Sequence, residues 1–242
     1  NQLKLSLADL NLDDLATAYD WSPAQREALE ALARHFRQPD LGWLAEFARI
    51  DDLDTFRDVE LGNRVAPSTL RVVQRRARSI VDLPCISADP GVSIGARLLD
   101  ELGAGKVVLV DVSGLGSMEE LLIASYLARR VIEEWQAAFL TDPERHARLP
   151  HVALVIEEAQ RVLSKTASRD LNVFARVARE GRKFKVGLCA VTQQPKLVDD
   201  ELLSQFNTFF ILGLADERDR SILRGSSKQD LTGLGPEIQT LM

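Results

Sequence analysis

The stretch HVALVIEEAQ, residues 151–160, decides the fold expected for the second half of this chain. Five apolar residues, Val152 to Ile156, lead directly into Glu157 and Glu158. A short apolar run of this length is typical of a buried β-strand. Carboxylates are costly to bury, so the pair marks the point where the strand leaves the core. An exposed acidic pair that opens a helix is the alternative, because acids suit a helix N-terminus.

Three further apolar runs resemble this one and alternate with helical patterns. Short apolar strands that alternate with helices predict an α/β fold, in which a parallel sheet is covered on both faces. The other strands are expected at residues 106–114, 185–195 and 208–214, and the helices at 117–139, 168–180, 199–206 and 215–225. In the helix at 117–139, Ser117 is expected to cap the first turn together with Glu120.

Polar side chains follow three of the predicted strands. They are Asp111 with Ser113, Glu157 with Glu158, and Thr192 with Gln193. Ligands of open α/β sheets bind at the carboxyl ends of the strands. We therefore expect these groups to converge on one site.

Residues 1–82 carry helical patterns and no β-rich run, so they are predicted to form a helical subdomain, with an α/β core over residues 83–242. Helices are expected near residues 6–19, 22–36, 41–50, 52–62 and 66–81. Ser22 is the expected N-cap of the second, followed by Pro23 at its first position. The last carries an apolar stripe of Leu70, Val73, Ala77 and Ile80.

Composition excludes several classes of protein. The 242 residues carry a net charge of −6, which argues against a generic nucleic-acid binder. No apolar run approaches the roughly 20 residues that span a membrane. Cys85 and Cys189 lie far apart and fit free thiols in a reducing cytoplasm. The three histidines stand in unrelated contexts, which argues against a zinc site.

One basic segment stands out in this acidic chain. Residues 161–185 hold eight Lys or Arg against two acids. These side chains could contact DNA, a nucleotide bound to a neighbouring subunit, or solvent.

The strand ends predict the chemistry of ATP hydrolysis. An apolar strand that ends in two carboxylates is typical of a Walker B element, in which one carboxylate lies near Mg²⁺ and the other orients the attacking water. We expect Glu157 on the metal side and Glu158 on the water. The amide of Gln193 suits a sensor between that water and the γ-phosphate, with a polar strand cap as its alternative. Arg179 or, preferably, Arg182 could act as an arginine finger across a subunit boundary, although a basic surface turn explains both equally simply.

Three segments in combination resemble the HerA branch of the HerA–FtsK P-loop ATPases. They are VVLVDVSGL (107–115), LVIEEAQRVL (154–163) and AREGRKFKVGLCAVTQQP (178–195). The resemblance covers roughly residues 105–225. It implies a RecA-like core, ATP and Mg²⁺ as cofactors, and a homohexameric DNA translocase or helicase that works with a NurA-type nuclease in DNA double-strand break repair and homologous recombination. In that family a His more often follows the Glu-Glu-Ala, where this chain has Gln160.

The implied roles follow the matching residues. Glu157 and Glu158 are the expected Walker B pair, Glu157 and Asp111 contact the cofactor, Gln193 is the sensor, and an arginine of the REGRKF turn is the finger. The helical residues 1–82 would correspond to a helical insertion of this branch.

The phosphate-binding loop of such ATPases has no match in this chain. GAGKV at 103–107 has Asp100 where the first glycine of G-x-x-x-x-G-K-[ST] is required, and it precedes a predicted strand. We therefore expect that the loop lies upstream of Asn1, that this chain is part of a longer cytoplasmic protein, and that it is inactive alone. The alternatives are a conjugation or secretion ATPase, and a non-hydrolysing assembly module that binds a partner nuclease.

Overall fold

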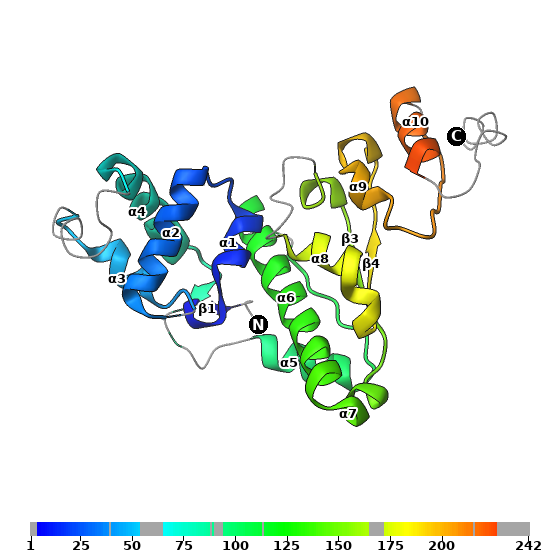
Figure 1. Cartoon of the computed structure of the whole chain (residues 1–242), viewed down its shortest axis with the longest axis horizontal. Coiled ribbons are helices and arrows are strands. Elements are labelled where there is room, and N and C mark those ends of the chain that lie inside the picture. Colours follow the sequence, from blue (N-terminus) through cyan, green and yellow to red (C-terminus); the bar gives the residue numbers. More distant parts are fainter. Residues whose placement is uncertain are drawn as a thin grey trace. The chain divides into compact units, whose positions relative to one another are not determined.

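The computed structural model describes residues 4–38, 40–53, 65–87, 89, 94–112, 114–164, 172–214 and 216–226. The chain forms two compact units, Asn1–Arg130 and Val131–Met242. Helices and short parallel strand pairs occur together, which agrees with the predicted α/β class (Figure 1). The boundary expected at residue 82, between a helical insertion and an ATPase core, stays a prediction.

The first unit is mainly helical. Its helices are η1 (Leu7–Asp9), α1 (Leu12–Ala18), α2 (Pro23–Phe36), α3 (Trp43–Arg49), α4 (Pro67–Val81) and α5 (Ile94–Gly103). The Ser22 hydroxyl caps α2 as predicted, and the Gln25 side chain bonds back to the Ser22 amide. The predicted apolar stripe of α4 is buried. The helix expected at 52–62 lies outside the described residues from position 54 onward.

Three details of the first unit differ from the sequence prediction. The helix expected over 6–19 is interrupted, because the Asn11 side chain accepts hydrogen bonds from the Asp13 and Asp14 amides and starts a new helix there. Strand β1 (Leu5–Ser6) pairs in parallel with β2 (Ile86–Ser87) in a segment where only helix was expected. Helix α5 was not predicted.

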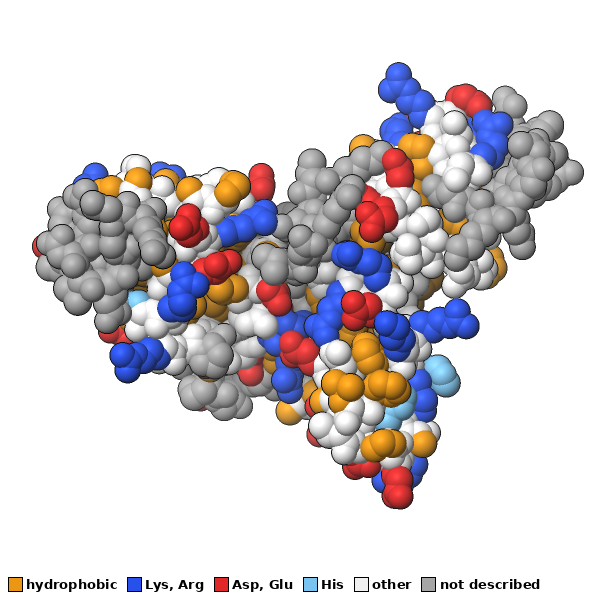
Figure 2. Space-filling model, viewed as in Figure 1, with side chains coloured by type: hydrophobic (Ala, Val, Ile, Leu, Met, Phe, Trp, Pro, Cys, Tyr) orange, Lys and Arg blue, Asp and Glu red, His pale blue; other side chains and the backbone are white. Residues whose placement is uncertain are grey.

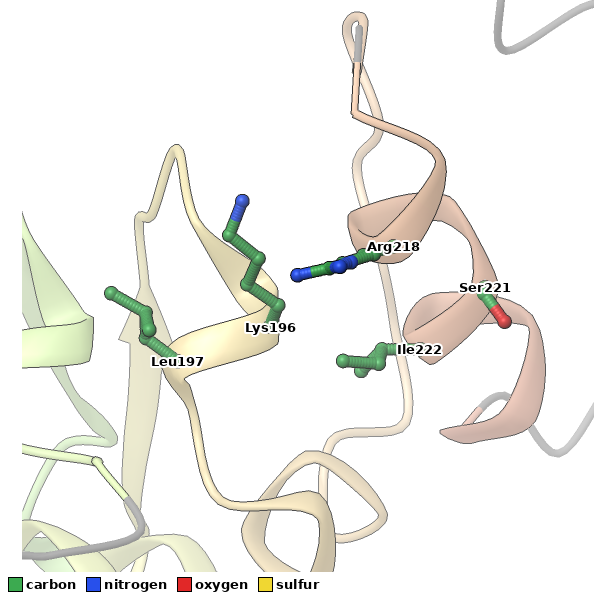
Figure 3. Close-up of a pocket in the computed structure, with 5 residues that line it drawn as sticks. All are labelled: Lys196, Leu197, Arg218, Ser221 and Ile222. Carbon is green, nitrogen blue, oxygen red and sulfur yellow. The ribbon is translucent and has the colours of Figure 1, made fainter.

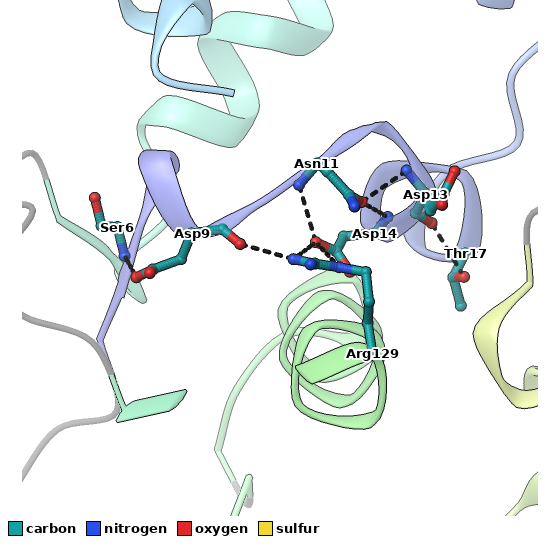
Figure 4. A network of polar contacts seen from close by, with 7 residues as sticks. All are labelled: Ser6, Asp9, Asn11, Asp13, Asp14, Thr17 and Arg129. Atoms are coloured by element: carbon teal, nitrogen blue, oxygen red, sulfur yellow. Dashed lines mark hydrogen bonds and ion pairs between the residues drawn. The ribbon is translucent and has the colours of Figure 1, made fainter. Parts of the chain in front are cut away.

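A buried ion pair joins α1 to α6 (Ser117–Thr141) within the first unit. The Arg129 guanidinium donates to both carboxylate oxygens of Asp14, with the shortest contact at 2.7 Å, and to the Asp9 carbonyl (Figure 4). Both side chains are almost fully buried. Removing one partner of such a pair would strand an uncompensated charge, so the network fixes α1 on α6.

The strand predicted at residues 106–114 is not formed. The backbone of Lys106–Val112 is neither helix nor strand, and Val107 and Leu109 are 99% and 91% exposed. Val110 and Val112 pack instead against the helical core. A strand requires a neighbour that shares its hydrogen bonds, and a run of apolar residues does not reveal whether that neighbour exists.

Helix α6 matches the helix predicted at 117–139 and runs through the division between the units. Its first turn is closed differently from the prediction. The Gly116 amide donates to the Glu119 carboxylate at 2.6 Å, and the helix begins at Ser117 itself. Glu119, not Glu120, therefore reaches back over the helix start.

The second unit contains the strand pair that was expected to carry the site. Its elements are α7 (Pro143–Arg148), β3 (Val152–Ile156), η3 (Ala159–Arg161), α8 (Val173–Glu180), η4 (Gly181–Phe184), β4 (Val186–Ala190), η5 (Pro195–Leu197), α9 (Asp200–Leu203) and α10 (Glu217–Ser226). Strands β3 and β4 are parallel and in register from Val152 opposite Val186 to Ile156 opposite Ala190. Figure 2 shows Lys and Arg side chains, in blue, over α10.

The strand predicted at residues 208–214 is also absent. The backbone there is irregular, and Phe210 and Leu212 are 89% and 85% exposed. As at residues 106–112, the apolar run is present without a hydrogen-bonded neighbouring strand among the described residues. The sheet of the second unit, within the part that the structure describes, is the β3–β4 pair.

Candidate active site

The carboxyl ends of β3 and β4 bring four of the predicted polar residues to one edge. Because the strands are parallel and in register, Glu157 and Glu158 follow β3 beside Thr192 and Gln193, which follow β4. The two glutamates and Gln193 are exposed, and Thr192 is half-buried. The predicted convergence is therefore found for these two strands.

The backbone loops out one residue where the glutamates leave the strand. The Val191 amide donates to the Ile156 carbonyl at 2.9 Å, and the Val191 carbonyl accepts from the Ala159 amide at 3.0 Å. A regular parallel ladder would take the second bond from Glu158. The extra residue makes this a bulge, a feature that often re-aims a side chain beside an active site.

Glu158 has a left-handed backbone conformation, with φ 52° and ψ 41°. Residues other than Gly, Asn and Asp seldom adopt this conformation, because their Cβ atom crowds the following carbonyl. Its carbonyl accepts from the Arg161 amide at 2.9 Å, and Ala159 beyond it is fully buried. Strain of this kind concentrates at functional sites. Of the two glutamates, only Glu158 has this left-handed conformation.

Gln160 connects the two strand ends through its side chain. Its amide nitrogen donates to the Glu158 carboxylate, and its amide oxygen accepts from the Thr192 hydroxyl at 2.5 Å. The Thr192 hydroxyl accepts in turn from the Gln194 amide at 3.0 Å. The sequence alone assigned Gln160 no role, because the resembled family more often has His at this position. That correspondence was the signal available in the sequence.

The candidate arginine fingers lie at the opposite end of β4. Arg179 lies in the last turn of α8 and Arg182 lies in η4, and both are exposed. The Arg179 Nε donates to the Ala175 carbonyl of its own helix at 3.3 Å. Both precede β4, whereas Gln193 follows it, and a five-residue strand spans about 16 Å. The structure does not bring these arginines to the glutamates of the same chain.

Glycine is required where α8 turns into β4. A Cβ on Gly181 would lie 2.3 Å from the Val186 carbonyl oxygen and 3.1 Å from the Val177 side chain. This close approach lets the chain reverse within η4 before the strand begins. It fixes where Arg179 and Arg182 stand relative to β4.

Part of the basic segment has structural contacts. The Lys185 ammonium donates to the carbonyls of His146, Ala147 and Leu149 at 2.7, 3.0 and 3.0 Å. Arg176 donates to the Gln136 side chain. These contacts join the segment to α6 and to the end of α7. Lys165 and Arg169 lie outside the described residues.

A shallow hollow of about 520 Å³ opens just beyond the end of β4, lined by Lys196, Leu197, Arg218, Ser221 and Ile222 (Figure 3). Arg218 and Ile222 extend from α10 toward the Lys196 segment. The Lys196 ammonium pairs with the Asp216 carboxylate, and this hydrogen bond raises the pKa of Lys196 and lowers that of Asp216. The pair ties η5 to the start of α10.

The carboxylates fit a metal that is held mainly by water and phosphate. Mg²⁺ usually takes one or two protein carboxylates and completes its shell with water and substrate phosphates. Glu157 and Glu158 are exposed at a strand end and can supply such ligands. Among the described residues, no three His, Cys, Asp or Glu side chains gather as an all-protein metal site would require. Asp111 belongs to the first unit, so its place beside Glu157 stays a prediction.

Helices together with parallel strands define the class as an α/β protein, and acidic and amide side chains lie at the strand ends, where ligands of such proteins bind. No family model matches the chain. Curated relatives do. DNA double-strand break repair helicase HerA of Saccharolobus solfataricus is 32% identical over 145 residues, 60% of this chain and 29% of that protein. The probable helicase MJ1565 of Methanocaldococcus jannaschii is 34% identical over 131 residues, 51% of this chain and 25% of that protein. HerA of Pyrococcus furiosus is 31% identical over 112 residues, 43% of this chain and 20% of that protein.

These similarities make the chain a relative of the HerA-type helicases, which confirms the resemblance found in the sequence. The chain spans less than a third of the length of each of these three relatives. No helix among the described residues is long and apolar enough to cross a membrane.

Proposed function

We propose that this chain is part of an ATP-driven DNA helicase or translocase of HerA type that acts in DNA double-strand break repair. The relatives' names support the helicase activity and the repair role. The observation that carries the proposal is the bulge after β3, where the left-handed Glu158 is connected through the Gln160 side chain to Thr192 at the end of β4. A hexamer, a RecA-like core and a NurA-type nuclease partner are further parts of the proposal.

Each residue of the strand edge has a role in this mechanism. Mg·ATP supplies the phosphoryl group and the charge-neutralising cation. Glu158 accepts a hydrogen bond from the attacking water and orients it, and Glu157 faces the metal through water. Gln193 contacts the γ-phosphate side with its amide, and Asp111 is proposed to complete the cofactor contacts. The loop that cradles the phosphates is proposed to lie outside these 242 residues, so the chain alone is expected to be inactive.

The arginine finger is proposed to act on the neighbouring subunit. Arg179 and Arg182 lie at the other end of β4 from Glu158, so neither reaches this edge within one chain. In a ring, that end can face the next subunit's nucleotide. Arg182 is the preferred finger.

The test of this function is Glu158→Gln in the complete protein that carries this chain. The amide keeps the size of the side chain and cannot accept the proton of the water. DNA-stimulated ATP hydrolysis should fall about 10²–10⁴-fold, the usual contribution of a general base, while ATP binding persists. Glu144→Gln, at an exposed glutamate of α7, is the control and should leave hydrolysis unchanged. Unchanged hydrolysis in Glu158→Gln would overturn the assignment.

A further inference from the structure

The side chain of Gln160 lies in a chain of hydrogen bonds whose direction is set by its neighbours. The Thr192 hydroxyl accepts from the Gln194 amide and therefore has its proton available for the Gln160 carbonyl oxygen. With its oxygen facing Thr192, Gln160 presents its NH₂ group to Glu158. A carboxylate can only accept, so Glu158 determines the orientation of the amide, and the Thr192 hydroxyl, which can donate, fits that orientation.

This chain of contacts connects the two proposed halves of the hydrolytic edge. Glu158 stands at the end of β3, and Thr192 directly precedes Gln193 at the end of β4. The backbone bonds around Val191 hold the same two segments together. The side-chain bridge therefore spans a rigid junction, and Glu158 is its most exposed member.

A long, exposed glutamate has several rotatable bonds and needs a partner to hold one position. The left-handed backbone of Glu158 fixes where its Cα–Cβ bond points, but not where the carboxylate lies. Gln160 is half-buried on η3, and its amide oxygen accepts the hydrogen bond that the Thr192 hydroxyl donates, which leaves the NH₂ group facing Glu158. It is thus placed to fix the carboxylate.

We infer that Gln160 is a positioning residue, which holds the water-orienting Glu158 and links it through Thr192 to the γ-phosphate side of a bound nucleoside triphosphate. This inference rests on the proposed function. Through this bridge, the presence or absence of the terminal phosphate at the end of β4 would change the position of the Glu158 carboxylate.

The experiment is a double-mutant cycle on ATP hydrolysis in the complete protein. Gln160→Met keeps the length of the side chain and removes both polar atoms, and Thr192→Val removes the hydroxyl at constant shape. Each should lower kcat about 10- to 100-fold, the range expected when a catalytic group is displaced by about 1 Å. KM for ATP should change little, because the nucleotide's binding contacts remain.

The combined Gln160→Met/Thr192→Val variant should have a kcat no lower than that of the less active single variant, because both changes break the same bridge. Thr192→Ser keeps the hydroxyl and should retain activity close to the unmodified protein. Gln38→Met, at an exposed glutamine of the first unit, should have no effect. Thermal unfolding of each variant separates misfolding from mispositioning.

Three results would overturn the inference: unchanged kcat in Gln160→Met, losses that multiply in the double variant, or a loss confined to KM. If Glu158→Gln abolishes hydrolysis while Gln160→Met does not, the inference fails and the proposed function stands. If neither variant changes hydrolysis, the proposed function itself fails.

Discussion

At the scale of single residues, Glu158 occupies a conformation that suits glycine better. A left-handed backbone costs an L-residue about 1–2 kcal/mol, and a glycine would avoid this cost. The greater flexibility of glycine in the unfolded chain would lower the free energy of unfolding by about 0.5–1 kcal/mol, so part of the gain is lost. We expect Glu158→Gly to raise the free energy of unfolding by about 0.5–1 kcal/mol and to abolish ATP hydrolysis. Urea denaturation measures the first quantity.

The matched control is Glu157→Gly, because Glu157 lies outside the left-handed region. That change should lower the free energy of unfolding by a similar amount, through the entropy of the unfolded chain. If both variants were destabilised equally, Glu158 would not be strained in the folded protein.

Cys85 gives the chain a distinct dependence on pH. Burial, and next the nearby Glu119 carboxylate, raise its pKa from 9.0 to about 11. The thiolate therefore forms more readily in the unfolded chain, and the stability contributed by the neutral thiol is complete below pH 9 and is lost as the pH rises toward 11. The loss of thermal stability between pH 8 and pH 10.5 should be smaller in Cys85→Ala than in the unmodified chain. Cys189→Ala, at an exposed thiol, should keep the original slope.

At the scale of elements, the turn from α8 to β4 depends on one glycine. In Gly181→Ala the new Cβ would meet backbone, which cannot move aside as a flexible side chain can. We expect a loss of about 3 kcal/mol, at the upper end of what overpacking costs. Gly103→Ala, where a Cβ meets nothing within 4 Å, is the control and should change stability little. Equal denaturation midpoints for both variants would contradict the tight approach.

Elements with local signals could be predicted, and those that depend on distant partners could not. Ser22 and Pro23 marked the start of α2, and continuous apolar runs marked β3 and β4, because caps and apolar runs are encoded within a few residues. The predicted burial of the first strand was wrong in part, since Val155 in β3 is 65% exposed and no described element covers it. The runs at 106–114 and 208–214 carried the same pattern and form no strand, since pairing needs a neighbour that no local pattern specifies. The bulge at Glu158 and the bridge by Gln160 also escaped prediction, because they depend on how the ends of two strands meet.

At the scale of the whole molecule, the separation of Arg182 from Glu158 by the length of β4 predicts behaviour in an assembly. An Arg182→Ala protein should hydrolyse ATP poorly alone, because each site lacks its neighbour's arginine. Mixing it with Glu158→Gln protein should restore part of the activity, since some junctions then combine an intact Glu158 with an intact arginine. Arg218→Ala, at an exposed arginine of α10, is the control and should need no rescue. Activity that stays absent after mixing would contradict a finger supplied in trans.

The left-handed Glu158 also bears on how this sequence can change over generations. A single base substitution converts either glutamate codon to a glycine codon, and the glycine would relieve the backbone at that position. A homologue that no longer hydrolyses ATP and serves only in assembly would lose no activity by that substitution and would have a more stable fold. The glutamate at position 158 is therefore what a chain under continuing selection for its chemistry should carry, and glycine or asparagine at the same position would be the first mark of a relative that has become a non-hydrolysing subunit.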